Sequence, residues 1–413
     1  MADHQGDLLR HHGVASCDGG PPSFAAQVRD FRAFGAATVP LQDGGIPYFG
    51  NEFWTSRQRQ AHASHEISYR ACFKPQLPAF FIERLTERDD TIYDPFMGRG
   101  TTLIEAALQG RCPVGNDINP LAPMLVRPRL NPPRLAEVAR RLDEIPWDRA
   151  APEAGELLAF YSPATLRQIV SLRHWLLQRL PAAVTPDPVD DWIRMVAINR
   201  LTGHSAGFFS IYTLPPNQAV SAAAQRKINE RRGQVPPDRD VRQLILAKTA
   251  SLLRHGPPPA HPEALLLTRS AESTPEIPDA SVRLVVTSPP FLDVVQYSLD
   301  NWLRSWFAGI DPSSVAIAEH RSERAWQHMV RETLFELARI VAPGGHVAFE
   351  VGEVRRGKLL LERLVWEAAA GLPFARLFVM VNRQDFTKTA NCWGVANNRM
   401  GTNTNRIVVL RRA

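Results

Sequence analysis

Short apolar runs alternate with helical patterns in two separate parts of the chain. In the first part, the apolar stretch at 91–93 is followed by a helical pattern at 103–108 and a second apolar stretch at 113–117. This order predicts strand, helix and strand, a βαβ half-unit. The alternation resumes near residue 264, where we expect strands at 264–267, 282–286, 346–351, 375–381 and 406–410 and helices at 326–341 and 359–370. Such alternation is typical of an α/β fold with a largely parallel sheet.

The region between these two parts has a different pattern. Helical periodicity appears at 135–145, 164–180, 190–201 and 241–254, and proline-rich joints separate the helices. We interpret this region as an inserted, largely helical domain. The predicted organisation is a poorly ordered arm at 1–45 with one short helix at 24–34, a first half-domain at 46–135, the insertion at 136–263 and a second half-domain at 264–413.

Composition narrows the class of protein. The 413 residues are 44% hydrophobic and carry a formal charge of +6, with a sequence pI near 9.4. The basic balance favours a polyanionic partner, although many basic proteins bind no nucleic acid. The four cysteines are scattered, without the spacing of a metal site, so we expect a reducing compartment and no bound metal. No signal peptide or membrane-length apolar stretch is evident, and we expect a cytoplasmic protein that does not contact a membrane.

Two glycines lie between the strand at 91–93 and the helix that follows it. The segment reads Asp94-Pro95-Phe96-Met97-Gly98-Arg99-Gly100-Thr101-Thr102. Glycine lets backbone approach a ligand closely, and a helix N-terminus favours an anionic group. The turn alone predicts only a nucleotide-like ligand, because the six-position dinucleotide pattern is absent. Simple turn punctuation is the alternative interpretation.

The complete string resembles the S-adenosylmethionine-binding motif of amino-group DNA methyltransferases. The similarity continues through Glu105-Ala106, Gly110-Arg111 and Gly115-x-Asp117-x-x-Pro120. It implies a Rossmann-like class I methyltransferase sheet with an antiparallel last strand, and S-adenosylmethionine as cofactor. In this interpretation Gly98 and Gly100 wrap the methionine end, whose carboxylate the Thr101 and Thr102 hydroxyls receive. Asp94 would face the ammonium or the sulfonium, and Asp117 would accept hydrogen bonds from the ribose hydroxyls.

A second motif, Ser288-Pro289-Pro290-Phe291, follows the apolar run at 282–286. It therefore lies at the carboxyl end of a predicted strand, where open α/β sheets bind their ligands. Taken alone, Ser-Pro-Pro is common loop sequence. In the family that the first motif resembles, this motif lines the pocket for a flipped base, and the serine form is commoner among enzymes that methylate N4 of cytosine.

The chemistry of an amine methylation agrees with these residue types. An exocyclic amine is a poor nucleophile, because its lone pair is delocalised into the ring. The Ser288 hydroxyl and the Pro289 carbonyl can accept its protons, Pro290 helps to fix the backbone, and Phe291 offers a face on which the base can stack. A 5-methylcytosine mechanism would need a cysteine nucleophile after a proline, and no cysteine is near in sequence.

The segment Tyr69-Arg70-Ala71-Cys72-Phe73-Lys74-Pro75 resembles the remaining cofactor motif of the family, in which an aromatic residue and a Lys-Pro pair flank the methionine end. A basic connector is the alternative. Where the family often has Gly-Asp-Ala against the adenine, this chain has Arg269-Ser270-Ala271, so Ser270 or Glu272 is the candidate contact. The predicted cofactor set is Phe73, Lys74, Asp94, Phe96, Gly98, Gly100, Thr101, Thr102, Asp117 and Ser270.

The motif order places the inserted region between the cofactor motif and the Ser-Pro-Pro-Phe motif, the position of a target-recognition region. Its basic run supplies the candidate phosphate contacts Arg226, Lys227, Arg231 and Arg232. Aromatic and amide residues at 204–218 could line a base pocket. A solvated helix face and a buried core are the alternatives. The amide-rich segment before the last strand adds Asn403 and Arg406 as candidates bordering the cleft, or as turn formers.

These observations lead to one hypothesis with two alternatives. We expect methylation of an exocyclic amino group in double-stranded DNA with the base flipped out, N4 of cytosine before N6 of adenine, at a specific sequence and with a possible restriction-modification partner. The first alternative is the same chemistry on RNA or a small molecule. The second is a nucleic-acid-binding module without activity, which the intact Ser288 and Asp94 motifs disfavour.

Overall fold

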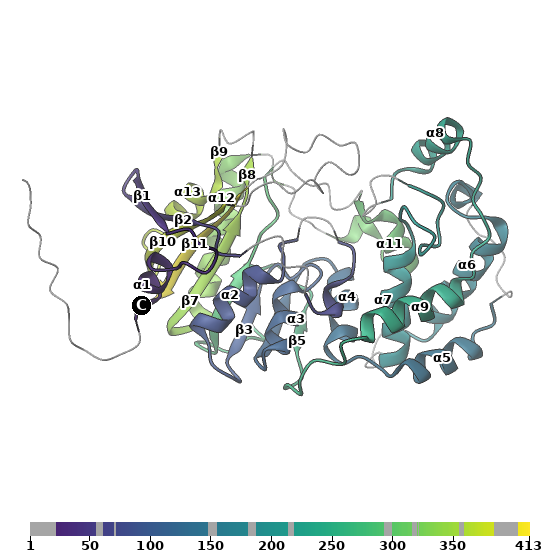
Figure 1. Ribbon diagram of the computed structural model, residues 1–413, viewed down its shortest axis with the longest axis horizontal. Helices are drawn as coiled ribbons and strands as arrows, with labels where there is room; N and C mark the ends of the chain where they lie inside the picture. The colour runs from purple at the N-terminus through teal and green to yellow at the C-terminus, as the bar shows by residue number, and fades with distance from the viewer. Residues whose placement is uncertain are drawn as a thin grey trace, which may run out of the picture.

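The computed structural model describes residues 22–54, 61–69, 72–147, 155–180, 187–213, 219–292, 300–315, 320, 322–354, 359–383 and 404–413. A twisted sheet occupies one side of the molecule, and a group of helices occupies the other (Figure 1). The sheet has nine strands in the order β1-β2-β10-β11-β7-β6-β3-β4-β5. These strands are β1 (Val39–Asp43), β2 (Ile46–Asn51), β3 (Thr91–Asp94), β4 (Cys112–Asn116), β5 (Leu265–Leu267), β6 (Val282–Thr287), β7 (Val341–Val351), β10 (Phe374–Arg383) and β11 (Thr404–Arg412).

Strand direction defines the edge of the sheet where a ligand can bind. β3 pairs in parallel with both β4 and β6, and β11 runs antiparallel between β7 and β10. The chain leaves β3 toward β4 on one side and later returns to β6 on the other, so the strand order reverses between β3 and β6. A crevice opens at such a switch point, outside the carboxyl ends of the strands. The predicted mostly parallel sheet with an antiparallel last strand is confirmed.

Alternating side chains of the strands fill two apolar layers. On one face, Val347 and Phe349 of β7 pack with α12 (Glu323–Ile340) and α13 (Leu361–Ala368). On the other, Ala348 of the same strand packs with α1 (Phe24–Arg29) and α2 (Gln76–Leu85). This period of two is what a strand covered on both faces requires. The helix α3 (Thr101–Leu108) and the helix α4 (Leu121–Leu130) enclose a smaller core beside β4.

The helices beside the sheet share a core of their own. They are α5 (Leu135–Glu144), α6 (Pro163–Gln178), α7 (Pro188–Arg200), α8 (Ala222–Arg232), α9 (Val241–Leu253) and α11 (Trp302–Ala308). Trp192 and Phe307 are both buried in this core, although they come from α7 and α11. The predicted limits of the insertion, 136 and 263, stay predictions. The shared core also takes in α11, which lies beyond them in sequence, and Tyr69 from the segment before the first motif.

The short elements complete the description. Single helical turns of the 3-10 type lie at Ala63–His65, Gly155–Ala159 and Pro312–Ser314, and a separate hairpin joins β8 (Glu353–Val354) to β9 (Leu359–Leu360). Within the described residues, no helix is both long and apolar enough to cross a membrane.

The short helix expected within 24–34 is present but ends at Arg29, and the expected poorly ordered arm at 1–45 needs a correction for the residues that the structure describes. Residues 24–29 form α1, whose Phe24 ring lies 5.8 Å from the ring of Phe378 in the sheet core. Residues 39–43 form β1, the edge strand that pairs with β2. Phe24 and Val28 are spaced as one buried helix face, and this spacing accounts for the ordered start. Residues 1–21 lie outside the described part of the chain.

Candidate active site

The turn between β3 and α3 adopts backbone conformations that favour glycine. Gly98 has a φ of +48° and Gly100 a φ of +75°, both in the left-handed region. A Cβ on Gly100 would lie 2.5 Å from Cγ2 of Val126 in α4, so space as well as conformation excludes a side chain there. The Gly98 N–H donates to Oδ2 of Asp117 at 2.8 Å. The glycine turn is therefore fixed against the end of the neighbouring strand β4.

Asp94, the last residue of β3, is a buried carboxylate at the switch point. The Thr287 hydroxyl donates to its Oδ1 at 2.6 Å, and the Phe96 N–H donates to the same oxygen at 3.1 Å. Burial raises the pKa of Asp94 to about 7, and the hydrogen bonds from Thr287, Phe96 and Thr102 lower it only in part. No cationic side chain of the described residues forms an ion pair with Asp94, so its ionised form has no counter-ion there.

Asp117 has the same character one strand further along the sheet. Its Oδ1 accepts the Asn119 N–H at 2.8 Å, while Oδ2 holds the glycine turn. Burial raises the pKa of Asp117 to about 6. Here too, the described part of the chain supplies no ion-pair partner. Two carboxylates thus lie at the ends of β3 and β4 with hydrogen bonds from neutral groups only.

Asn116 joins the loops on either side of these carboxylates. This fully buried amide donates to the carbonyls of Pro95 at 3.3 Å and Arg269 at 3.0 Å, and it accepts the Arg269 N–H at 3.0 Å. Satisfied buried amides hold backbone in one arrangement, because breaking them leaves unpaired polar groups. Asn116 therefore places Ser270, the residue after Arg269, beside the glycine turn.

Two arginines hold the segment before α2 against the same turn. Arg99 donates to the carbonyl of Ile67 at 2.9 Å and to the Thr101 hydroxyl at 3.2 Å. Arg129, almost completely buried, donates to the carbonyl of Ser64 at 2.9 Å and also to that of Arg99. These bonds bring Tyr69 to the mouth of the crevice.

Ser288 follows directly on β6, across the crevice from Asp117. The adjacent strand β7 carries Glu350, which is buried and accepts a hydrogen bond from Nδ2 of Asn405 at 3.0 Å. Burial raises the pKa of Glu350, and hydrogen bonds from Ser288 and Asn405 lower it. Ser288 is therefore hydrogen-bonded to a carboxyl group that can take up a proton more readily than an exposed glutamate.

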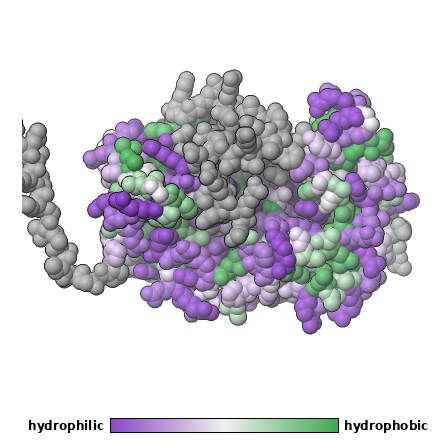
Figure 2. Space-filling view, in the orientation of Figure 1, coloured by the Kyte–Doolittle hydropathy of each residue, from purple (hydrophilic) through white to green (hydrophobic). Residues whose placement is uncertain are grey.

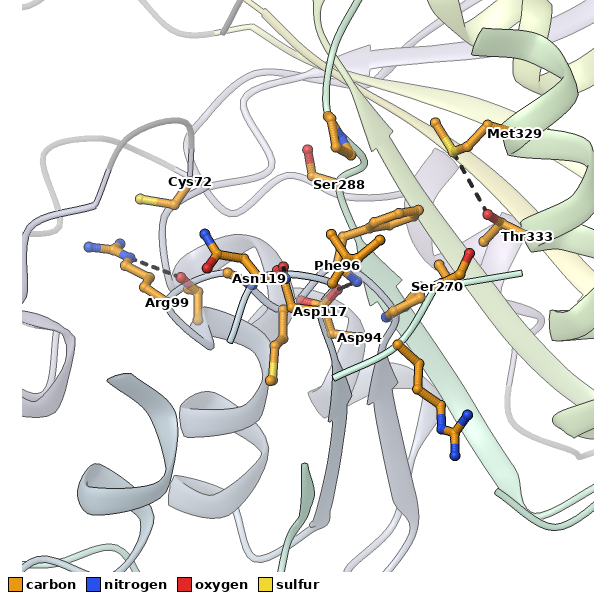
Figure 3. A pocket seen from close by; sticks show the side chains of 18 of the residues that line it. Cys72, Asp94, Phe96, Arg99, Asp117, Asn119, Ser270, Ser288, Met329 and Thr333 are labelled. Carbon is orange, nitrogen blue, oxygen red and sulfur yellow. Dashed lines mark hydrogen bonds between the residues drawn. The ribbon is translucent and has the colours of Figure 1, made fainter. Parts of the chain in front are cut away.

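A single cavity of about 250 Å³ joins these groups. Figure 3 shows Asp94, Asp117, Phe96 and Ser288 around it, with Met329 and Thr333 of α12 on one side and Cys72 and Arg99 on the other. Of the residues predicted from sequence, the following line it: Phe73, Asp94, Phe96, Gly98, Thr101, Asp117, Ser270, Ser288 and Pro290. Side chains from both halves of the sequence therefore meet at the switch point of the sheet.

The remaining predicted residues of the two motifs lie behind this lining or outside it. Thr102 is fully buried and its hydroxyl donates to the carbonyl of Val286 at 3.0 Å, so its expected contact with a cofactor carboxylate is corrected. Gly100 packs on Val126, and Lys74 is exposed and does not line the cavity. Phe291 packs against the core beneath α12, in place of the expected open face for a base. Pro289 is buried beside Ser288.

The predicted DNA-contact residues are farther away. Arg226, Lys227 and Arg231 are exposed on α8, and Arg232 lies over the ring of Tyr212 at 3.9 Å. Phe208 and Phe209 belong to the buried core and do not form a base pocket. Arg406 does not line the cavity and instead pairs with Glu362 of α13 at 2.7 Å. Asn403 lies outside the described residues.

The structure adds residues to which the sequence analysis assigned no role: Met97, Arg99, Ile118, Asn119, Glu350, Met329 and Thr333. Glu350 could have been predicted from the sequence, because it lies one residue from the carboxyl end of a predicted buried strand. Asp94 and Ser288 were predicted from the same kind of position. Met329 and Thr333 had none, since a methionine and a threonine on a helix are typical core residues.

The strand order and the cavity at the switch point are those of a Rossmann-like class I methyltransferase fold. A family model described as DNA methylase (N6_N4_Mtase) matches residues 47–122, which contain β2, the glycine turn and Asp117. Over this stretch the chain is similar to the amino-group DNA methyltransferase family.

Two curated relatives match the chain over 96 and 76 residues. The chain is 32% identical over 96 residues to the Type II methyltransferase M.MvaI of Kocuria varians, covering 22% of this chain and 21% of that protein. It is 36% identical over 76 residues to the Type II methyltransferase M.MjaII of Methanocaldococcus jannaschii, covering 18% of this chain and 14% of that protein. The matched stretch is thus about a fifth or less of each relative.

One solved structure is similar over a longer stretch but at low identity. The TehB-like SAM-dependent methyltransferase of Corynebacterium glutamicum aligns with 7% identity and a TM-score of 0.29, over 81% of this chain and 87% of that one. The fold assignment rests on the strand order and not on this likeness.

The residues present fit S-adenosylmethionine. The cofactor carries a cationic methionine end and a ribose diol, and the cavity offers Asp94 and Asp117, two buried carboxylates without counter-ions in the described part of the chain. A buried carboxylate without a partner is costly, and a cation or a pair of hydroxyl donors removes that cost.

Proposed function

We propose that this protein transfers the methyl group of S-adenosylmethionine to an exocyclic amino group of a base flipped out of duplex DNA, with N4 of cytosine as the target. The observation that carries the proposal is the continuous cavity from Asp117 and Asp94 to Ser288. A methyl donor held at one end and an amine at the other would meet at the carboxyl end of β6. Positioning two reactants in this way supplies a large part of the catalytic effect.

Each end of the cofactor has candidate partners. Asp117 accepts from the ribose hydroxyls, Asp94 faces the cationic end, and Thr101 at the first turn of α3 receives the carboxylate. Phe73 and Tyr69, which also line the cavity, would flank the methionine end, and Ser270 and Glu272 would contact the adenine. When bound, the cofactor supplies an electrophilic methyl group on a sulfonium.

Ser288 and Pro289 prepare the amine. The serine oxygen and the proline carbonyl accept the two amino protons, which draws the nitrogen toward a tetrahedral form whose lone pair points at the methyl group. Two consecutive prolines restrict the backbone, so these acceptors need little reorganisation. Trp326 of α12 adds to the restraint by donating to the Pro290 carbonyl at 2.8 Å.

Glu350 provides a destination for the proton. As the new N–C bond forms and the C–S bond breaks, the amine becomes positively charged and must lose a proton. Ser288 takes that proton on its oxygen and passes its own proton to Glu350, whose pKa burial has raised. Replacing Glu350 with Gln keeps the size and a hydrogen-bonding group but removes the acceptor, so turnover should fall while cofactor affinity stays unchanged.

The choice of cytosine rests on Ser288. In the family that this chain resembles, serine at this position is commoner among N4-cytosine enzymes. A cysteine-dependent attack on carbon 5 is disfavoured, because it would need a cysteine that follows a proline, and Cys72, which lines the cavity, follows Ala71. The restriction-modification partner and the cytoplasmic location stay predictions.

The direct test is to incubate the protein with radiolabelled S-adenosylmethionine and unmethylated genomic DNA, digest the DNA to nucleosides and identify the labelled one by mass spectrometry. N4-methylcytosine is the expected product. N6-methyladenine would keep the site and correct the base. Label in RNA and not in DNA, or in neither while the cofactor still binds, would overturn the proposed substrate. Ser288→Ala is the matched control for contaminating activity.

A further inference from the structure

α8 presents a stripe of basic side chains to solvent. Arg226, Lys227 and Arg231 are all exposed. Lys227 directly follows Arg226, and Arg231 lies one helical turn further along, so the three side chains share one side of the helix. Within the described part of the chain, none of the three forms an ion pair or a hydrogen bond. Lys227 and Arg231 are four residues apart, where like charges destabilise a helix. Glu230 is also exposed and lies four residues after Arg226 and three after Lys227, so the stripe includes one acidic side chain, and these four side chains together carry a net charge of +2.

The opposite side of α8 is fixed to the helical region by amide hydrogen bonds. Gln225 donates to the Tyr212 carbonyl at 3.0 Å, and Asn229 donates to the Ala159 carbonyl at 2.8 Å. Both ends of the helix are capped, by the Ser221 hydroxyl and by Gly233 in the left-handed conformation. The direction in which the basic stripe points is thus determined by the fold.

The loop after α8 carries an exposed apolar side chain beside this stripe. Val235 is 83% exposed, the highest value among the large apolar side chains of the described residues. Gln234 holds the loop in place, because its side chain donates to the Tyr212 carbonyl at 3.1 Å and to Oδ1 of Asn229 at 2.8 Å. An apolar group fixed next to three cations fits a surface of phosphates bordering apolar sugars and base edges.

α8 lies at the same edge of the molecule as the segment that follows the carboxyl end of β7. In Figure 1, α8 and the β8–β9 hairpin, which follows the carboxyl end of β7, both stand at the upper edge. Figure 2 shows α8 as a strongly hydrophilic projection at that edge. α5, by contrast, lies at the lower edge. A duplex that delivers a base to Ser288 can therefore extend toward α8.

We propose that α8 and the loop after it form a DNA-docking surface, in which Arg226, Lys227 and Arg231 contact backbone phosphates and Val235 rests against the groove. The inference rests on the proposed function, because it assumes a DNA substrate. It commits the basic stripe to duplex DNA and assigns positioning, not chemistry, to α8. Arg232 is not part of the contact, because it is engaged with Tyr212.

The test compares two triple variants with the same change in net charge. The first is Arg226→Gln, Lys227→Gln and Arg231→Gln. The control is Arg134→Gln, Arg140→Gln and Arg242→Gln, which neutralises three exposed or half-exposed arginines directly before α5, on α5 and at the start of α9; Arg134 pairs with Glu137 and Arg242 with Asp143. Binding to a fluorescent DNA duplex is measured over a range of salt concentrations, together with kcat and KM for DNA.

The stripe variant should lose about two to three units of slope in the plot of log affinity against log salt, one per lost phosphate contact, and about a hundredfold in affinity at low salt. Its kcat at saturating DNA and its cofactor affinity should equal those of the native protein. The control should keep the native slope. Val235→Asp should weaken DNA binding more than Leu135→Asp on α5, since it brings a negative charge to the groove.

The outcomes separate this inference from the proposed function. If the native protein methylates DNA and the two triple variants have the same salt slope, α8 is not the docking surface. If the native protein labels no DNA, the proposed function itself fails. Tighter binding of an RNA duplex than of the matching DNA through the same stripe would also overturn the inference. Matching thermal unfolding curves for both variants exclude misfolding as the cause.

Discussion

Buried aspartates occur in both regions of the molecule, but their surroundings differ. In the helical region, Asp191 is paired with Arg194 at 2.5 Å and with Arg127 at 3.3 Å, and the neighbouring Asp190 is paired with Arg141 and with Arg179 at 2.6 Å. At the carboxyl edge of the sheet, Asp94 receives hydrogen bonds from neutral groups only. The same residue type thus carries its counter-ions in one region and lacks them, among the described residues, in the other.

The difference indicates which charges serve the fold and which are held for a ligand. A buried pair is internally compensated, and breaking it leaves one charge unpaired. An unpaired buried carboxylate is expensive in the free protein and becomes stable when a ligand brings the missing charge. The helical region therefore uses its aspartates to hold helices together, while the sheet edge retains a cost that S-adenosylmethionine would remove.

The largest effect should come from Ser288, at the carboxyl end of β6. Ser288→Ala should lower kcat by about a hundredfold to ten-thousandfold, because it removes an acceptor that acts on the reacting amine. Cofactor affinity, measured by calorimetry, should be unchanged. Loss of cofactor binding together with turnover would mean that Ser288 holds the cofactor and does not prepare the amine.

Asp191→Asn breaks the pair that is most buried in the helical region. Arg194 and Asp191 each have 3% exposed side chains, so the arginine would lose its main counter-ion in a dry site. The free energy of unfolding should fall by about 3 to 5 kcal/mol, as urea denaturation would measure. A loss below about 1 kcal/mol would show that Arg127 and solvent compensate, and the contrast between the two regions would be weaker.

The sequence was sufficient to predict a feature of the structure where that feature depends on one residue type or on apolar periodicity alone. Gly98 and Gly100 need left-handed backbone, and the order of strands and helices follows from apolar periodicity, so both were predictable. Phe291 and Thr102 were assigned to ligands, but their motif does not reveal that one packs into the core and the other bonds to Val286. Pairing across the sequence was equally hidden: nothing near Arg406 indicates Glu362, and nothing near Asp191 indicates Arg127.

Asp94→Asn replaces a buried aspartate at the sheet edge, as Asp191→Asn does in the helical region. It should raise the stability of the free protein, whereas Asp191→Asn should lower it. The amide can still accept from Thr287, and the buried charge disappears. Native Asp94 has a pKa of about 7 against an ordinary value of 3.8, so the native state binds the extra proton and stability falls as pH rises from about 4 to 7. The variant should lack this fall and be the more stable protein above pH 7.

The same variant should bind S-adenosylmethionine about ten to a hundred times more weakly above pH 7, because a hydrogen bond to a charged partner is lost. Thermal unfolding with and without the cofactor measures both effects. Thr287→Val is the matched control, since it removes one hydrogen bond and keeps the charge. A variant less stable than native at pH 8 would show that Asp94, like Asp191, has a structural partner.

The smallest effect concerns the native protein and requires no substitution. If the cofactor's cation binds the ionised form of Asp94, affinity must rise with pH until the carboxyl is deprotonated. With a pKa of about 7 the expected dependence is up to tenfold per pH unit below 7 and flat above it. Asp117, with a pKa of about 6, would steepen the dependence below 6, because a protonated oxygen accepts hydroxyl donors less well.

In Asp94→Asn the rise in cofactor affinity between pH 6 and 7 should vanish, and only the Asp117 component should remain. Affinity that is already constant from pH 5 upward would mean that both carboxylates are ionised in the free protein, and the distinction between the sheet edge and the helical region would then rest on geometry alone.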